Sequence, residues 1–295
     1  METVLNHPVR PSQRANDTAR LPPPVTTVRR SCWRGRVVTG GERALPEEIP
    51  VALTYNGSSH AVMMASPADL EDFAIGFSLT EGLVRTMNEI ETLEVIPDEL
   101  GIELRMFLSR PQAERLQGRR RAKAGPTGCG LCGVESLAEV MPVLPRVDSP
   151  LRIGVDSIRR ALEDFASHQH LNRQAHALHA AAFWQAGQDP ILREDVGRHN
   201  ALDKLAGALA RAGSSAAGGF VILSSRVSIE MVQKAAAMGA PVIVAFSAPT
   251  ALAVRACDNA GLTLVAIARA DSFEVFTHPA RICVASAWRA ARPAA

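Results

Sequence analysis

The second half of the chain predicts an α/β domain built on a largely parallel sheet. Three short apolar runs, at residues 220–223, 241–246 and 262–267, start 21 residues apart. The gaps between them hold helix-like segments, at residues 228–238 and 250–260, that end at Gly239 and Gly261. Strands and helices that alternate at this spacing form right-handed βαβ units, in which helices cover the sheet.

The first half predicts a smaller α+β region. Residues 51–55 and 60–64 flank Asn56-Gly57, a pair that suits the positive φ angles of a hairpin turn. Ser66 and Pro67 fit the cap and the first position of a helix that Gly82 ends. Two more strands are expected, at residues 91–96 and 102–108.

These patterns divide the 295 residues into four parts. Residues 1–30 lack periodicity and predict a disordered tail. Residues 31–150 form the α+β region, and prolines at 142, 145 and 150 mark a linker at its end. Residues 151–285 form the α/β domain, which opens with a helix that Asp156 caps, and residues 286–295 are a second tail.

Composition places the chain in a reducing compartment. The net charge is only +2, so no overall charge favours nucleic acid or membranes as partners. No apolar run reaches the roughly 18 residues of a membrane span, and the first 30 residues lack the apolar core of a signal peptide. The five cysteines are an odd count without a secretion signal, which argues against a disulfide scaffold. We therefore expect a soluble cytoplasmic protein.

Cys129 and Cys132 form the only close cysteine pair of the chain. Glycines flank both residues, and the segment upstream, residues 110–123, carries six basic residues against one acidic residue. We expect a mobile basic loop over residues 109–133, with a helix at residues 134–141. Positive charge and a helix N-terminus both favour the thiolate form of cysteine. The pair alone allows metal binding, redox cycling or sulfur transfer, although a zinc site needs two further ligands.

A second motif crowds charged residues into the short segment 193–204. It contains Asp195, Arg198, His199, Asp203 and Lys204, followed by leucines at helical spacing, and Asn200 is placed to cap this helix. Two interpretations fit this composition. The charged residues either form salt bridges at the start of a helix, or they form a cluster that orients a polar ligand.

Polar residues also follow two of the predicted strands. Ser225 and Arg226 come after the first, and Ser247 and Thr250 come after the second. In open parallel sheets, ligands bind beyond the carboxyl ends of the strands, where helix N-termini attract anions. These residues therefore indicate a phosphate-bearing or nucleotide ligand, although Ser228 and Thr250 also fit ordinary helix caps.

Six sequence blocks together carry a resemblance to a known family. In chain order they are VALTYNG (51–57), EDFAIGFSLTEG (71–82), GCGLCG (128–133), REDVGRHNALDK (193–204), RVSIEMVQK (226–234) and SAPT (247–250). The chain resembles the formate dehydrogenase accessory sulfurtransferases, the FdhD family, from about residue 35 to residue 283.

This resemblance implies a function and a site. Such proteins take sulfur from a cysteine desulfurase as a persulfide, which places the persulfide on Cys129 with Cys132 as its partner. They deliver it to the molybdenum (or tungsten) bis-guanine dinucleotide cofactor, as bound substrate, for the catalytic subunit of formate dehydrogenase. A C-terminal stretch linked to binding this cofactor corresponds to Phe273, Glu274, Val275, Phe276, Thr277 and His278.

The resemblance also implies a homodimer and a fold. The C-terminal domain would be a cytidine-deaminase-like, three-layer α/β/α unit with a mixed sheet. One block departs from the family pattern Thr-Gly-x-x-His-Ala-Ala, because Ala175 and His176 replace Thr and Gly while His179 is kept. Details of the cofactor pocket are therefore expected to differ here.

Three other functions remain to be separated by experiment. A zinc deaminase shares the implied fold, but its H-x-E and P-C-x-x-C signature is missing. A chaperone for the cofactor or the apo-enzyme would need its cysteines only for structure. A zinc-stabilised binding module would reveal itself by its metal content.

Overall fold

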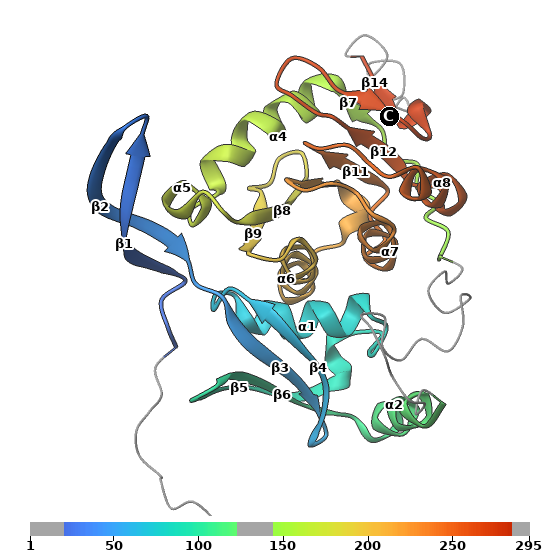
Figure 1. The fold of residues 1–295 in the computed structure, drawn as a ribbon. Helices are drawn as coiled ribbons and strands as arrows, with labels where there is room; N and C mark the ends of the chain where they lie inside the picture. Colours follow the sequence, from blue (N-terminus) through green and yellow to red (C-terminus); the bar gives the residue numbers. More distant parts are fainter. Residues whose placement is uncertain (1–20, 123–143, 285–295) are drawn as a thin grey trace, which may run out of the picture.

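The computed structural model describes residues 21–122 and 144–284, which form a six-stranded sheet, a four-stranded sheet, a projecting two-stranded ribbon and a short parallel strand pair, with helices packed on the two larger sheets (Figure 1). Cys129, Cys132, the predicted helix at residues 134–141 and the tail from residue 286 lie outside the described residues. Among the described helices, none is both long and apolar enough to cross a membrane.

The larger sheet has six strands in the order β13-β12-β11-β10-β8-β9. The three central strands, β10, β11 and β12, are parallel and confirm the βαβ prediction, whereas the other pairs are antiparallel, so the sheet is mixed. The strands are β8 (His179–Trp184), β9 (Ile191–Asp195), β10 (Phe220–Leu223), β11 (Val242–Ala245), β12 (Thr263–Ala266) and β13 (Glu274–Val275).

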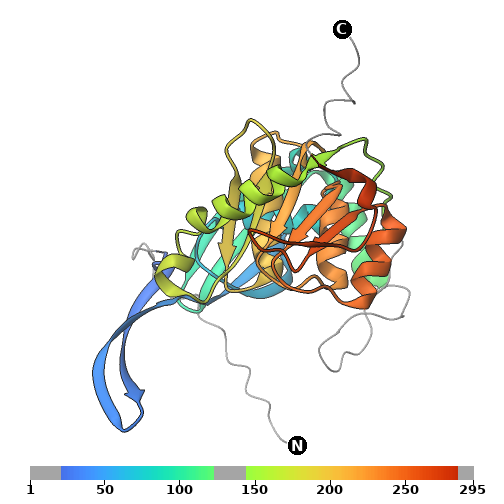
Figure 2. The ribbon, with the colours of Figure 1, turned by 90° about the horizontal axis from the view of Figure 1, so that it is seen from above.

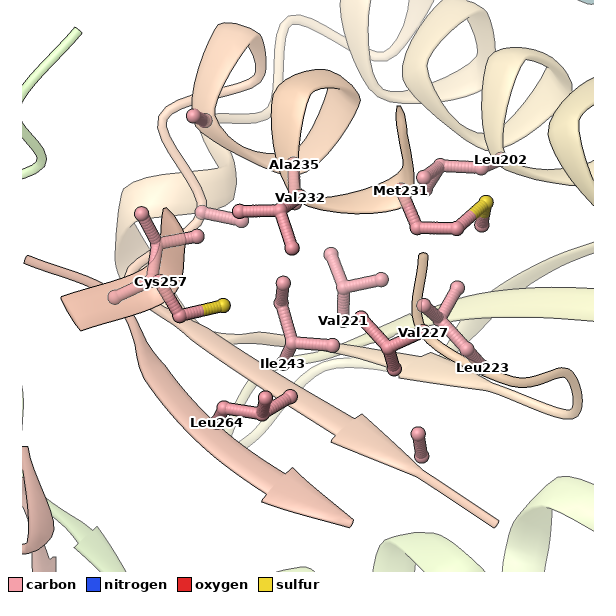
Figure 3. Close-up of a cluster of buried hydrophobic side chains, with 14 of the residues drawn as sticks. Leu202, Val221, Leu223, Val227, Met231, Val232, Ala235, Ile243, Cys257 and Leu264 are labelled. Carbon is pink, nitrogen blue, oxygen red and sulfur yellow. The ribbon is translucent and has the colours of Figure 1, made fainter. Parts of the chain in front are cut away.

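Helices cover both faces of this sheet because successive strand residues point to opposite sides. One face packs on α4 (Val155–His168). The other face packs on α6 (Arg198–Arg211), α7 (Ile229–Ala237) and α8 (Ala251–Ala260). Figure 3 shows this second core, in which Val221, Ile243 and Leu264 of the strands meet Met231 and Cys257 of the helices. Both predicted helices between the parallel strands are confirmed, with Gly239 and Gly261 in left-handed conformations at their ends.

Two details of the predicted helix starts are wrong. Helix α4 begins at Val155 after Gly154, so Asp156 lies within its first turn instead of capping it. Helix α6 begins at Arg198, and Asn200 is buried inside its first turn, where its side chain serves other partners. Thr250 does cap α8, because its hydroxyl accepts a hydrogen bond from the backbone N–H of Ala253.

The smaller sheet has four strands in the order β4-β3-β6-β5 and packs one face on α1 (Leu70–Thr80). Its strands are β3 (Ile49–Tyr55), β4 (Ser58–Ala65), β5 (Ile90–Asp98) and β6 (Gly101–Leu108). The predicted hairpin is confirmed, and Asn56 and Gly57 have φ angles of 49° and 75°. These are the positive values that a type I′ turn requires.

Helix α1 starts three residues later than the sequence predicts. Ser66 does not cap it, because the Ser66 hydroxyl accepts a hydrogen bond from Val196 N–H and the Ser66 N–H donates to Asp195. The chain turns instead at Asp69, which has φ 52°, and the helix begins at Leu70. Hydrogen bonds to Asp195 and Val196, far away in the sequence, thus occupy Ser66, which the local pattern assigns to the helix cap.

Two segments that the sequence assigns to disorder or to a loop are regular. The predicted tail ends earlier than residue 30, because β1 (Val25–Arg34) pairs with β2 (Val37–Pro46) along its whole length. Hydrogen bonds between β1 and β2 hold this ribbon together, and none of the side chains of the two strands is buried. The sequence of these strands therefore shows no apolar period. The predicted loop from residue 109 opens instead with helix α2 (Arg110–Ala122).

The remaining elements are short. They are η1 (Met87–Glu89), β7 (Ile153–Gly154), α5 (Asn172–Ala175), η2 (Ala216–Gly218), η3 (Pro279–Arg281) and β14 (Ile282–Cys283).

Candidate functional site

The carboxyl ends of the central strands gather most of the predicted ligand-binding residues at one edge of the larger sheet. Ser225 and Arg226 follow β10, and Ser247 follows β11, its parallel neighbour. His179 starts β8, which runs antiparallel to β10, so it lies at the same edge. Arg198 begins α6, three residues after β9 ends at this edge. The strand register thus brings these segments to the same edge of the sheet.

An open groove of ≈ 550 Å³ lies at this edge. Its lining residues are Ser224, Phe246, Ser247, Ala248, Ile267 and Arg269. Ile267 has a φ of 53°, a left-handed conformation that is strained for a β-branched residue. Phe246, Ile267 and Arg269 were not predicted as site residues; their position directly after strands β11 and β12 was the signal available in the sequence.

His179 is held neutral at the start of β8. Its Nδ1 lies 3.5 Å from the hydroxyl of Ser224, which also accepts a hydrogen bond from Ala180 N–H. Burial lowers the pKa of His179, and the positive charge of Arg198 lowers it further, against the smaller opposing effect of Asp195. A neutral imidazole at this edge offers hydrogen bonds without adding charge.

His199 lies near the start of α6, and its Nε2 is 2.9 Å from a carboxylate oxygen of Glu230 on α7. Burial is the largest influence on this ring and lowers its pKa, and Arg198 and Lys234 act in the same direction. The nearby carboxylate of Glu230 raises the pKa but does not outweigh them. Glu230 was not predicted as a site residue.

Much of the charged motif at residues 193–204 joins the two sheets of the molecule. Lys204 and Asp195 form an ion pair of 2.6 Å in which both side chains are 0% exposed. Lys204 also donates to the Ser66 carbonyl of the smaller region, and Asp195 accepts from the Ser66 N–H. Asn200 links the same two parts, because its amide donates to Asp195 and to the carbonyl of Met64. These three residues of the motif thus have structural partners within the chain.

A second buried pair connects the same parts of the molecule. Lys234 of α7 lies 2.9 Å from Asp203 of α6 and 2.7 Å from Glu81, just beyond α1. The Thr80 hydroxyl donates to Asp203. Burial alone would lower the pKa of Lys234, but Asp203 and Glu81 together outweigh it and raise the pKa above its ordinary value. Lys234 is therefore a charged contact between α7 and α1.

Helices α1 and α6 cross at very close range between these pairs. A Cβ added to Gly76 would strike the backbone of Asp203, and one added to Gly207 would strike the backbone of Asp72. The Asp72 carboxylate is buried and receives Arg193 at 2.7 Å and Arg211 at 2.8 Å. Two glycines and a shared carboxylate therefore allow the regions to pack backbone against backbone.

The segment from Phe273 to His278 runs along the sheet and does not gather at one point. Glu274 pairs with Ala266, the last residue of β12, so Phe273 and Glu274 lie at the edge of the groove. The chain then runs antiparallel to β12. Thr277 is buried and hydrogen-bonds the backbone of Leu262 and Leu264, and His278 lies beside Asp258 near the opposite edge. Thr277 therefore holds the outer strand in place.

Residues 147–149, near the start of the second described range, are anchored by Arg281. Arg281 is nearly buried, and its guanidinium donates to the carbonyls of Val147, Ser149 and Gly261. Val147 N–H also donates to the carbonyl of Ala260. No three His, Cys, Asp or Glu side chains within residues 21–122 and 144–284 are placed to hold a metal together.

Comparison with known proteins identifies the family. The model of the FdhD/NarQ family matches residues 46–283. The chain belongs to the FdhD/NarQ family. The FdhD relatives include the sulfur carrier protein FdhD of Agrobacterium fabrum, which is 50% identical over 257 residues, 86% of this chain and 95% of that protein. The protein of the same name from Cupriavidus necator is 48% identical over 262 residues, 88% of this chain and 91% of that protein.

A crystal structure from Desulfotalea psychrophila has the same fold. That protein is named after a suggested role as a formate dehydrogenase accessory protein, and it is 24% identical to this chain with a TM-score of 0.69. The alignment covers 88% of this chain and all of the other. The predicted FdhD family and the α/β class are thus confirmed, and the finer cytidine-deaminase-like arrangement stays a prediction.

Proposed function

We propose that this chain is a sulfur carrier that sulfurates the molybdenum (or tungsten) bis-guanine dinucleotide cofactor of formate dehydrogenase. The observation that carries the proposal is the family match over residues 46–283 together with relatives that bear the name sulfur carrier protein at about half identity. The likeness to an accessory-protein structure agrees with formate dehydrogenase as the partner enzyme.

Sulfur would be carried on Cys129, with Cys132 as the neighbouring thiol. The Cys129 thiolate attacks the outer sulfur of a persulfide on a cysteine desulfurase, a new S–S bond forms, and the donor cysteine leaves as a thiolate. Loading therefore transfers one sulfur atom and needs no outside oxidant. Buried Cys257 is a poor competitor, because burial raises the pKa of its thiol to about 12.

The guanine dinucleotide ends of the cofactor would bind at the carboxyl edge of the larger sheet. The N-termini of α7 and α8 lie there, and the nearby side chains that favour a diphosphate are Ser225, Arg226, Ser247, Thr250 and Arg198. Neutral His179 and His199 add hydrogen-bonding capacity at the same edge. Of the C-terminal stretch, Phe273 and Glu274 are best placed to take part.

The same proposal includes a cytoplasmic homodimer with a cytidine-deaminase-like C-terminal domain. Its partners are a cysteine desulfurase and the catalytic subunit of formate dehydrogenase. The cofactor is the substrate of this chain and is passed on.

Intact-protein mass spectrometry tests the carrier step. The full chain is incubated with a cysteine desulfurase and cysteine, and Cys129→Ala and Cys132→Ala are compared with Cys283→Ala, a described cysteine outside the pair, as the matched control. We expect a gain of about one sulfur mass that reductant removes, present in the control and absent in Cys129→Ala.

Two results would count against the proposal. If Cys129→Ala gains as much sulfur as the Cys283→Ala control, Cys129 does not carry the persulfide. Full activation of formate dehydrogenase by Cys129→Ala would favour a chaperone whose cysteines are only structural.

A further inference from the structure

A second cavity, of ≈ 430 Å³, opens at the amino edge of the larger sheet. Phe220 begins β10 and Trp184 ends the antiparallel β8, so both lie at the edge opposite the groove of the candidate site. Helix α4, which crosses one face of this sheet in both ribbon views (Figures 1 and 2), contributes its first two turns to the wall. The volume lies within the range of small-molecule sites.

One part of this wall is apolar and includes a flat aromatic surface. It is the end of the core between α4 and the sheet, and its residues are Leu151, Ile153, Trp184 and Phe220. The rings of Trp184 and Phe220 lie 5.1 Å apart with 34° between their planes. Phe220 is fully buried and supports the indole ring, whereas Trp184 is only half-buried. A planar ligand can therefore stack on Trp184.

Positive charge lies beside the apolar wall, because Arg152 and Arg160 also line the cavity. Within residues 21–122 and 144–284, neither guanidinium pairs with a carboxylate. Arg152 donates to the backbone carbonyls of Pro150 and Leu151, and Arg160 donates to that of Asp156. Each guanidinium has five N–H donors, so both keep donors for a ligand. Two arginines and the single lining acid, Asp156, leave a net charge of +1 around the cavity.

We propose that this cavity binds a small planar monoanion, such as an aromatic carboxylate or sulfonate. The planar body stacks on Trp184, and the acidic group accepts hydrogen bonds from Arg152 and Arg160, which are strong because both partners are charged. A ligand with several negative charges fits less well, because Asp156 offsets one of the two arginines. The site is separate from the carboxyl edge of the sheet, and the proposal does not rest on the sulfur-carrier function.

Anilinonaphthalene sulfonate, an aromatic monoanion whose fluorescence rises in apolar surroundings, tests this site on the whole chain. Titration is expected to give a dissociation constant of roughly 30 µM, the value that a typical binding energy per atom gives for a ligand of this size. The double variant Arg152→Gln and Arg160→Gln is expected to bind the probe at least about tenfold more weakly. Phenylnaphthylamine, the same ring system without the sulfonate, is expected to bind the wild type and this variant equally.

The matched control is Arg159→Gln, an exposed arginine of the same helix that donates to the carbonyl of Asp271 and lies outside the cavity wall. It is expected to bind the sulfonate as the wild type does. Trp184→Leu, checked for folding by circular dichroism, is expected to weaken the binding of both probes at least about threefold. Unchanged binding by the double arginine variant would overturn the proposal, as would equal weakening by Arg159→Gln or a wild-type dissociation constant above about 1 mM.

Discussion

Replacing Lys204 by methionine is expected to lower the free energy of unfolding by about 3 kcal/mol. The lysine is fully buried, and its loss leaves the Asp195 carboxylate without a cation. That carboxylate keeps three N–H donors, from Ser66, Gly197 and Asn200, which places the cost at the low end for a broken buried pair.

The reverse change, Asp195→Ala, is expected to cost more, about 5 kcal/mol. It leaves the Lys204 ammonium with backbone carbonyls alone and also removes the acceptor of those three donors, each worth about 1 kcal/mol. The double variant is expected to cost at least about 2 kcal/mol less than the sum of the single changes.

Urea unfolding at pH 7, followed by circular dichroism, measures these differences. The matched control is Arg110→Met, which breaks an exposed pair with Glu114 and is expected to change the free energy of unfolding by less than about 0.5 kcal/mol. The reasoning is refuted if Lys204→Met lies within about 1 kcal/mol of the wild type. It is also refuted if Asp195→Ala is the milder of the two changes.

Two further predictions concern the helix crossing and the histidines. Gly207→Ala is expected to destabilise the chain by more than about 2 kcal/mol because the new methyl group strikes the backbone of α1. Thermal unfolding measures this difference, with Gly40→Ala, in open space on β2, as the control. Equal melting temperatures of the two variants would contradict the close crossing. His179 and His199 have pKa values below their ordinary one, so the folded state binds fewer protons than the unfolded state. Their contribution to stability is complete above about pH 6.5 and is lost as the pH falls through the folded pKa values, and replacing both with Asn is expected to reduce the drop in melting temperature from pH 7 to pH 5. His168→Asn, at the exposed end of α4, is the control, and an unchanged pH dependence in the double variant would count against the assignment.

The sequence by itself determined the three parallel strands of the larger sheet, the four strands of the smaller sheet and the hairpin turn between β3 and β4. It also indicated that the polar residues after β10 and β11 share one edge of the sheet. Apolar runs such as residues 220–223 identify buried strands because a central strand has no solvent side to mark with polar residues. Asn56-Gly57 specifies a turn because few residue pairs accept two positive φ angles. Polar residues after β10 and β11 meet at one edge because parallel strands end on the same side, so their convergence follows from the order of elements.

Only the tertiary structure decided which charged residues are structural. Asp195 and Lys204 read equally well as ligand-binding groups, and Ser66, which both of them contact, lies more than 100 residues away in the chain. Ser66 does not cap α1 because it makes these long-range hydrogen bonds, and the helix starts at Leu70 instead. The ribbon of β1 and β2 was not predicted from the sequence for a different reason. None of its side chains packs in a core, so its sequence shows no apolar period. Local pattern records what a residue does within one turn or strand, whereas the partner of a buried charge is known only once distant segments have packed together.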